Sequence, residues 1–155
     1  MTKETYQKLR QFYMDHMVAF REIEHASGAS AEEYHNALGC RYDQQLKCLL
    51  VKVYLQGTDC FVMVTIPAQK RVDFGKIKEI FNAKKVRGAT LDEVKQVTGC
   101  EYGEVPPAGK IFGIKLLIDK DFMNENETYM NAGILTKSFV VNPHDIIRVE
   151  EPILF

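Results

Sequence analysis

The sequence predicts a mixed α+β fold, and three observations lead to this class. The chain has 155 residues, of which 46% are hydrophobic and 26% charged, which is enough apolar material for one core. Short runs of β-branched and apolar residues alternate with segments of helical periodicity that carry capping residues. Repeats, low-complexity tracts and interdomain linkers are missing from the sequence. We therefore expect a single domain over residues 1–155, with about five to seven strands and flanking helices, in a strand order that the sequence leaves open.

The N-terminal part of the chain predicts a helix, a strand and a second helix. An apolar stripe at helical spacing favours an amphipathic helix over about residues 4–18, formed by Leu9, Phe12, Tyr13 and Met17. Residues 18–25 favour an edge strand, because two apolar side chains stand among charges there. The capping-box spacing from Ser30 to Glu33 predicts a short helix that stops near Gly39. Its buried side would consist of Tyr34, Ala37 and Leu38.

The strongest local signal is a β-hairpin formed by residues 47–54 and 60–66, with a turn at residues 56–59. Alternation along the first strand places Lys47 on the same face as Leu49, Val51 and Val53. Two interpretations of this lysine remain open. Its ammonium could reach solvent past an apolar rim, or it could stand as a cation at the mouth of a pocket. Lys52, on the opposite face, is the weaker candidate.

The second half of the chain predicts further helices and strands. Asp73 is a plausible N-cap for a helix that ends near Asn82, and Thr90 opens a capping box for a helix that ends at Gly99. Short strands are expected at residues 85–87, 115–118, 127–130 and 138–141, with breaks at residues that include Asn131 and Gly133. The last helix should cover residues 145–150, with Asn142 as its cap and Pro143 at its first position.

A loop rich in glycine and proline occupies residues 99–109. Pro106 and Pro107 restrict φ and remove two donors, whereas Gly103 and Gly109 allow positive φ and leave backbone amides open. Such a loop suits the binding of an anion or an oxyanion. The alternative is a plain connection between a helix and a strand.

Composition limits the cellular compartment and the binding partners that we expect for this chain. No apolar run approaches the ~20 residues of a membrane span, and the first residues, MTKETYQKLR, lack the apolar block of a signal peptide. We therefore expect a cytoplasmic protein without a membrane partner. The net charge of -1 gives no overall attraction to nucleic acid, so we expect no DNA partner. An RNA contact would need a local patch such as Lys84, Lys85 and Arg87, which could equally be a solvated surface.

Cysteine and histidine spacing argues against a metal or redox site. The cysteines are widely spaced and form no C-x-x-C pair: Cys40, Cys48, Cys60 and Cys100. The histidines are equally scattered: His16, His25, His35 and His144. We therefore expect no metal and no cofactor, and buried or idle thiols.

Several short segments, in a fixed order, carry a family resemblance. They are Glu24-His25, the hairpin opening LKCLLV at residues 46–51, Val72-Asp73-Phe74, Thr98-Gly99, the G-x-x-x-P element from Gly103 to Pro107, Gly109, Ile118-Asp119, and YMNAG at residues 129–133. Together they resemble the YbaK and prolyl-tRNA-synthetase-associated domain family over nearly the whole chain. The resemblance implies a largely antiparallel or mixed, curved sheet and the free-standing editing deacylases of translation.

This resemblance implies hydrolysis of the ester between a wrong amino acid and the 3′-terminal adenosine of a tRNA, the second sieve of editing. The implied partners are aminoacyl-tRNA and, in addition, an aminoacyl-tRNA synthetase. The family assigns Lys47 and Gly103 to the catalytic site, the lysine to anchor phosphate or ester and the glycine to shape the aminoacyl pocket. No protein base is evident, and the resemblance implies that the substrate's own 2′-hydroxyl helps or, for a cysteinyl substrate, its own thiol. Further positions are implied to bind substrate: His25, Cys48, Glu104, Pro107, Asn131, Ala132, Gly133 and Ser138.

The chain departs from the family pattern at several of these positions. Cys48 stands where many members have threonine, Glu104 replaces a frequent glycine, and Pro106 replaces a frequent serine or threonine. Asn131 and Ser138 fall where the cysteine-removing members carry serine and aspartate. We therefore do not expect a direct copy of cysteinyl editing, but removal of a small amino acid from tRNA(Pro) or a related tRNA.

Two alternatives remain. The first is a non-catalytic module that binds a tRNA end, a nucleotide or a synthetase, which the departures at Cys48, Glu104 and Pro106 motivate. The second is a thiol-dependent enzyme that uses Cys48 or Cys100, although neither cysteine has an adjacent histidine.

Overall fold

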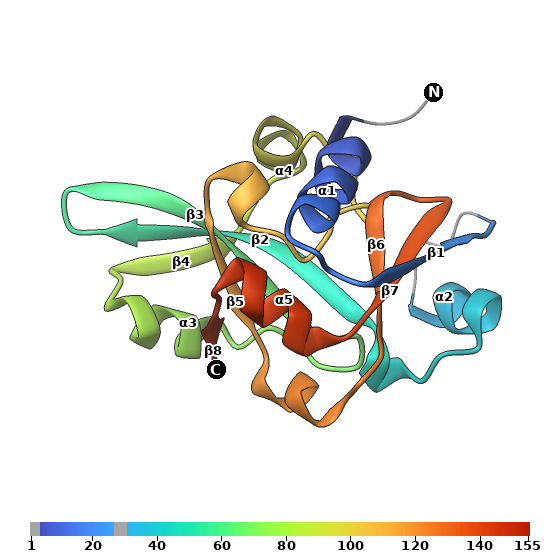
Figure 1. The fold of residues 1–155 in the computed structure, drawn as a ribbon. Coiled ribbons are helices and arrows are strands. Elements are labelled where there is room, and N and C mark those ends of the chain that lie inside the picture. The colour runs from blue at the N-terminus through green and yellow to red at the C-terminus, as the bar shows by residue number, and fades with distance from the viewer. Residues whose placement is uncertain (1–3, 27–30) are drawn as a thin grey trace.

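The computed structural model describes residues 4–26 and 31–155 and shows helices packed around two β-sheets (Figure 1). The helices in these ranges are α1 (Glu4–Asp15), α2 (Ala31–Leu38), α3 (Phe74–Phe81), α4 (Leu91–Thr98) and α5 (Pro143–Glu150). The strands are β1 (Phe20–Glu24), β2 (Leu46–Leu55), β3 (Thr58–Pro67), β4 (Lys85–Gly88), β5 (Lys115–Ile118), β6 (Thr128–Ile134), β7 (Lys137–Val141) and β8 (Ile153–Leu154). Short 3-10 helices lie at η1 (Tyr42–Gln44), η2 (Lys110–Phe112) and η3 (Lys120–Asn124). The predicted mixed α+β class is confirmed.

The strands divide into two sheets instead of the single sheet that we expected. The larger sheet has five strands in the order β4-β2-β3-β5-β8. Its β2 is antiparallel to β3 and β4, whereas β5 is parallel to β3 and to β8. The smaller sheet has three antiparallel strands in the order β1-β7-β6. β1 is an edge strand, as predicted.

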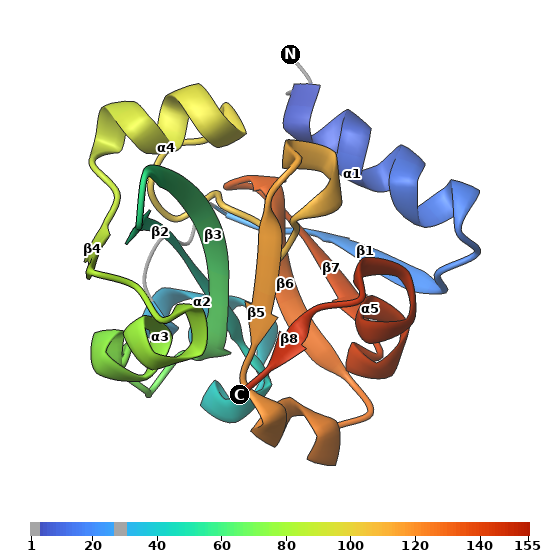
Figure 2. The same cartoon turned by 90° about the vertical axis from the view of Figure 1, so that its left-hand side faces the viewer.

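Side chains that alternate along the strands of the larger sheet belong to two different hydrophobic cores. Val51 and Val53 pack with Ile77 of α3 on one face. Leu46 and Leu50 belong to the other core, which the smaller sheet, α1 and α5 complete. Figure 2 shows α3 on one side of the β2–β3 hairpin and the smaller sheet on the other. Each fully buried aliphatic side chain in these cores stabilises the fold by about 1.5 to 3 kcal/mol.

The predicted hairpin is present and is longer than expected. β2 and β3 pair from Leu46 opposite Pro67 to Leu55 opposite Thr58. Only residues 56–57 form the turn, because Thr58 already belongs to the ladder. Gly57 provides the positive φ, 81°, that this tight reversal requires.

The helix signals in the sequence correspond to observed caps. The side chains of Asp73, Thr90 and Asn142 accept backbone N–H groups at the starts of α3, α4 and α5. Gly39 follows α2 with a positive φ of 68°, as predicted for its end. The capping box predicted at Ser30 lies outside the described residues.

Two helices differ from the prediction. α1 ends at Asp15, because Met17 takes a left-handed φ of 55° and the chain reverses there. Met17 is therefore 86% exposed and does not join the buried stripe that contains Tyr13. In α2 Tyr34 is buried, whereas Ala37 is exposed. None of the helices within the described ranges is long and apolar enough to cross a membrane.

β6 continues through the two residues that were expected to break it. The strand includes Asn131 and Gly133, with an irregular register between Asn131 and Ile134. Gly133 has a φ of 89°, and a Cβ there would lie 3.1 Å from the backbone nitrogen of Tyr6. The glycine thus serves a bulge that lets α1 approach the strand closely, and does not end the strand.

Candidate active site

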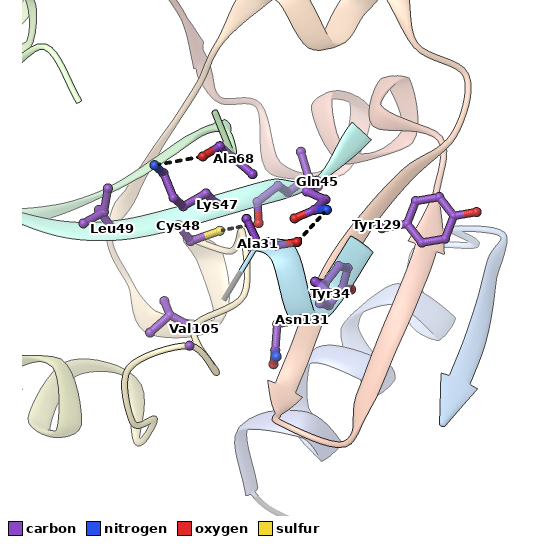
Figure 3. Close-up of a pocket in the computed structure, with 12 residues that line it drawn as sticks. Ala31, Tyr34, Gln45, Lys47, Cys48, Leu49, Ala68, Val105, Tyr129 and Asn131 are labelled. Carbon is purple, nitrogen blue, oxygen red and sulfur yellow. Dashed lines mark hydrogen bonds between the residues drawn. The ribbon is translucent and has the colours of Figure 1, made fainter. Parts of the chain in front are cut away.

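A cavity of about 280 Å³ opens where the two sheets separate (Figure 3). Gln45, just before β2, forms an isolated parallel bridge with Tyr129 of β6, and beyond this bridge the two strands enter different sheets. β4 pairs with β2 only from Val51 onward, which leaves the first half of β2 without a partner strand on that edge among the described residues. The cavity is lined by Ala31, Tyr34, Gln45, Leu46, Lys47, Cys48, Leu49, Ala68, Gly103, Val105, Tyr129 and Asn131.

The ammonium of Lys47 is held at this cavity by two backbone carbonyls. Its Nζ donates to the oxygen of Ala68 at 3.3 Å and to that of Lys70 at 2.6 Å. An ammonium has three N–H donors, so these two carbonyls leave one donor for a further acceptor. Partial burial, and then the nearby charge of Arg71, hold the pKa of Lys47 below its ordinary value. The structure supports the second interpretation of this residue, a cation held beside a pocket.

The central loop reaches the cavity through Gly103 and Val105. Gly103 has a φ of 83°, the left-handed conformation that the sequence suggested for it. The neighbouring Glu104 is turned inward, 4% exposed, and its Oε1 accepts the N–H of Glu101 at 2.8 Å. Glu104 therefore holds the loop, and neither faces water nor lines the cavity. Pro107 is buried in the same loop, outside the lining.

The end of the loop differs from the prediction of open amides. The N–H of Gly109 donates to the carboxylate of Glu150 at 3.3 Å, and the N–H of Lys110 donates to it at 3.0 Å. Burial raises the pKa of Glu150, against the lowering effect of these two amides. Gly109 has a φ of -128°, so positive φ is not its role. Glycine is needed there because a Cβ would lie 2.6 Å from the carbonyl oxygen of Ile114.

Asn131 carries an unpaired donor in the cavity wall. The residue is 8% exposed, and its Oδ1 accepts the N–H of Gly133 at 3.0 Å. Its Nδ2 has no hydrogen-bond partner, the one such buried side-chain nitrogen or oxygen in residues 4–26 and 31–155. Buried donors are nearly always paired, so this exception calls for an explanation.

Tyr34, which also lines the cavity, is held in place by a chain of hydrogen bonds. Its hydroxyl donates to Oγ of Ser138, which is fully buried, and this Oγ lies 2.7 Å from Nε2 of His25. The other ring nitrogen, Nδ1, lies 2.7 Å from the carbonyl oxygen of Ala26. Because a carbonyl only accepts, Nδ1 carries the proton and Nε2 accepts the Ser138 hydroxyl. Ser138 and His25 therefore stand behind Tyr34 and do not line the cavity.

A comparison with known protein families shows to which family the chain belongs. The sequence model of the aminoacyl-tRNA editing domain matches residues 25–149, from the histidine of this chain of hydrogen bonds to the last turn of α5. The chain belongs to the aminoacyl-tRNA editing domain family. The family expected from the short segments is thereby confirmed.

Relatives of the editing domain agree with this assignment. The multifunctional Ser/Thr-tRNA deacylase ProXp-y of Escherichia coli (strain K12) is 27% identical over 149 residues, 96% of this chain and 89% of that protein. The proline-tRNA ligase of Thermosipho melanesiensis is 26% identical over 125 residues, 74% of this chain and 21% of the ligase. 

Solved structures share the fold of this editing domain. A candidate trans-editing enzyme for prolyl tRNA synthetase has a TM-score of 0.82 at 22% identity and covers 100% of this chain and 97% of its own. The hypothetical protein APE2540 has a TM-score of 0.84 at 21% identity and covers 95% of this chain and 96% of its own. At sequence identities of 21% and 22%, the likeness to these two structures shows that the fold is shared.

The thiols of the editing domain are poorly suited to catalysis. Cys48 lines the cavity, but burial raises the pKa of its thiol to about 12, so the thiol stays protonated near neutral pH. Cys100 is 0% exposed. The structure therefore argues against the thiol-dependent enzyme.

The editing domain brings together some of the predicted site residues and separates others. Lys47, Cys48, Gly103 and Asn131 line one cavity, although they come from β2, the central loop and β6. The remaining predicted residues lie outside its lining: His25, Glu104, Pro107, Ala132, Gly133 and Ser138. Ala132 belongs to the core and Gly133 faces α1, so neither contributes to the cavity.

The sequence did not lead us to expect two aromatic residues in the lining of the cavity, Tyr34 and Tyr129. Tyr129 stands two residues before Asn131 on β6, so alternation could have placed both on one face. Tyr34 was expected to be buried, and only its tertiary position shows that its ring borders a cavity (Figure 3).

Charge pairing weakens the basic patch that the sequence suggested for RNA. Arg87 forms an ion pair with Glu93 at 2.8 Å and lies over the ring of Tyr54. Lys52 is likewise near Glu93, at 3.6 Å. Arg71 is exposed and is close enough to Lys47 to lower its pKa.

Proposed function

We propose that the chain is a trans-editing aminoacyl-tRNA deacylase that hydrolyses the ester of a small amino acid misattached to tRNA(Pro) or a related tRNA. One observation carries this proposal: Lys47 and Gly103, the two residues that the family motifs indicate, line the same cavity. Its volume of about 280 Å³ suits a small aminoacyl group and part of a ribose. The relatives' names support the same activity.

The cation at the cavity explains how this site would favour hydrolysis. Water attacks the ester carbonyl carbon, the bond to the 3′-oxygen breaks, and the proton from water ends on that oxygen, which releases the free amino acid. Negative charge develops on the carbonyl oxygen during attack, and the remaining N–H of Lys47 can stabilise it or hold the terminal phosphate. Backbone groups around Gly103 shape the aminoacyl pocket.

Among the residues that the structure describes, the cavity wall offers no protein base. Among the described residues that line it, the titratable ones are Tyr34, Lys47, Cys48 and Tyr129, and none carries a carboxylate or an imidazole. Neither thiol nor phenol is a base near neutral pH. We infer that the substrate's own 2′-hydroxyl assists the attacking water, and that the protein contributes binding, orientation and charge.

A panel of mischarged tRNAs tests the proposed activity. The purified protein is incubated with tRNA(Pro) and related tRNAs that carry alanine, serine, threonine, cysteine or proline, and amino-acid release is followed against a buffer control. We expect release of at least one small amino acid well above the control. Binding of these tRNAs in a gel shift, without release of any amino acid, would instead support the non-catalytic module.

The partners follow from the same proposal. The acceptor end of the tRNA would enter past Lys47 and Arg71, whose charges are available to phosphates. A synthetase that charges the tRNA is the natural second partner, since the editing step follows its error. We place this reaction in the cytoplasm, where tRNA is charged.

The anchor behind Tyr34 yields a prediction. We expect Tyr34→Phe, which keeps the ring but removes the hydroxyl bound to Ser138, to raise KM for the tRNA substrate about threefold to tenfold and to change kcat less. Loss of this buried hydrogen bond should also lower stability by about 1 kcal/mol. Steady-state kinetics and thermal unfolding measure the two effects.

A double mutant distinguishes an anchor from two separate effects. If Tyr34 acts through Ser138, Tyr34→Phe combined with Ser138→Ala should raise KM little more than either change alone. Tyr42→Phe, outside the cavity in η1, is the matched control and should behave as wild type. Additive increases in KM would show that the two side chains act independently.

A further inference from the structure

The backbone of β2 beside the cavity is a feature that the proposed function leaves unused. Residues 45–49 all line the cavity, although side chains of successive residues in a strand point to opposite faces of its sheet. Figure 3 shows this for Lys47 and Cys48, which leave β2 on different sides. A cavity on one face of the sheet would meet only every second residue. The cavity therefore lies along the edge of β2, where it meets the backbone of the strand.

The pairing of β2 shows which backbone groups face this edge. The carbonyl oxygen of Leu50 accepts the N–H of Ala89 at 2.9 Å, so it points toward β4. In an antiparallel strand the N–H and C=O of one residue point to the same side, and this side alternates from residue to residue. Cys48, two residues before Leu50, therefore turns its N–H and its C=O toward the same edge. Within the described part of the chain no strand pairs with β2 at Cys48, because β4 pairs with it only from Val51 onward.

The open stretch of this edge is short. At one end Gln45 forms its bridge with Tyr129 of β6, and at the other end Ala89 bonds to Leu50. Residues 46–49 lie between these contacts and span about 13 Å, at about 3.3 Å per residue. A complete strand of another protein needs a longer edge. One amino-acid unit and part of its ribose, in contrast, suit the cavity of about 280 Å³.

An aminoacyl ester carries the same polar groups as one residue of a strand. Its α-ammonium stands where a residue has its N–H, and its ester carbonyl stands where a residue has its C=O. In a hydrogen-bonded antiparallel pair, two residues that lie opposite each other exchange both of their hydrogen bonds. The edge of β2 at Cys48 therefore offers one donor and one acceptor in the arrangement that an aminoacyl group requires.

We propose that the aminoacyl group pairs with the backbone of Cys48 as a single residue of an added strand. The N–H of Cys48 donates to the carbonyl oxygen of the ester, and the C=O of Cys48 accepts a hydrogen bond from the α-ammonium. This inference rests on the proposed deacylase function and adds a contact to the reacting group. Because negative charge develops on the ester oxygen during the attack of water, the hydrogen bond from the N–H strengthens in the transition state. Cys48 thus serves the reaction through its backbone and not through its thiol.

A backbone ester tests the N–H of Cys48. Cys48→Ala is prepared with its ordinary amide and, for comparison, with lactic acid at position 48, which replaces the N–H by oxygen and keeps the methyl group. Both proteins are assayed on the mischarged tRNA that wild type hydrolyses fastest. We expect the ester to lower kcat/KM at least tenfold relative to Cys48→Ala.

The matched control for this ester lies four residues further along the same strand. Lys52→Ala and its counterpart with lactic acid at position 52 differ by an N–H that faces β4, since Lys52 lies opposite Arg87. The ester at position 52 should lower the melting temperature, because it removes a hydrogen bond of the sheet. It should leave kcat/KM within about threefold of Lys52→Ala.

A second measurement separates this inference from the proposed function. 3′-Alanylamido and 3′-propionylamido adenosine, which lack the ester and differ from each other by the α-ammonium alone, are titrated into wild type by calorimetry. We expect wild type to bind the alanyl analogue at least tenfold more tightly, because the C=O of Cys48 accepts a charge-assisted hydrogen bond only from that analogue. This result would support the pairing even if no tRNA were hydrolysed.

Two results would overturn the inference. Equal kcat/KM of the amide and the ester at position 48, both folded, would show that this N–H does not contact the ester oxygen. Equal affinities of wild type for the two analogues would show that the C=O of Cys48 does not hold the α-ammonium. Circular dichroism and the melting temperature of each variant confirm folding. If the ester at position 48 does not fold, the comparison of the two analogues in wild type decides.

Discussion

Lys47→Ala is expected to lower kcat/KM for deacylation at least tenfold while the protein stays folded. The substitution removes the cation that faces the cavity, and a charge-assisted contact to the reacting ester or phosphate cannot be replaced by a methyl group. The two hydrogen bonds to the carbonyls of Ala68 and Lys70 are also lost, but they involve a half-buried ammonium. Their loss should cost about 1 kcal/mol, which lowers Tm by about 2 to 4 °C.

Controls for Lys47 come from its own strand and from pH. Lys52→Ala, on the opposite face and outside the cavity, should keep wild-type kcat/KM. Because the pKa of Lys47 is lowered, kcat/KM should fall with rising pH before an ordinary lysine would lose its proton near about 10.4. Lys47 is mostly charged at pH values below its lowered pKa. We therefore expect activity at pH values below the range in which kcat/KM falls. Full activity of Lys47→Ala would remove this residue from the site.

Gly109→Ala is expected to be the most destabilising single change in the central loop. The added Cβ would lie 2.6 Å from the carbonyl oxygen of Ile114 and 3.2 Å from the backbone nitrogen of Leu116. Backbone atoms at and just before β5 cannot easily move aside, so the overpacking should cost about 2 to 3 kcal/mol. For a chain of this length Tm should fall by about 4 to 12 °C. The shift would also disturb the two amides that Glu150 binds.

The matched control for Gly109 is Gly88 in β4. A Cβ at Gly88 would meet no atom within 4 Å, so Gly88→Ala should change the free energy of unfolding by about 0.5 kcal/mol or less. Chemical denaturation of both variants measures the difference. If Gly109→Ala unfolds at the wild-type denaturant concentration, the close approach of the loop to residues 114–116 is not rigid.

Much of the secondary structure could be predicted because its signals are local. Asp73, Thr90 and Asn142 cap helices through groups within three residues of each other, and residues 56–57 form a turn that their neighbours determine. The errors arose where a distant contact overrides the local pattern. Gly133 was expected to break β6, but the approach of α1 at Tyr6 turns the glycine into a bulge within a continuous strand.

The site was only partly predictable, for the same reason. Glu104 follows Gly103 directly and Pro107 follows in the same loop, yet the loop folds so that Gly103 borders the cavity while the other two are buried outside its lining. Asn131 lines the cavity, but its neighbours Ala132 and Gly133 face the core and α1. Proximity along the chain is therefore a poor guide to membership of a site that tertiary contacts assemble.

The amino-acid sequence by itself determined the family, the hairpin, and the placement of Lys47 in an apolar row, since alternation and short motifs depend on neighbouring residues. Only the tertiary structure decided that Lys47, Gly103 and Asn131 share one cavity. The cavity exists because two sheets meet at the bridge between Gln45 and Tyr129 and then diverge, and this pairing joins residues that are far apart in the chain.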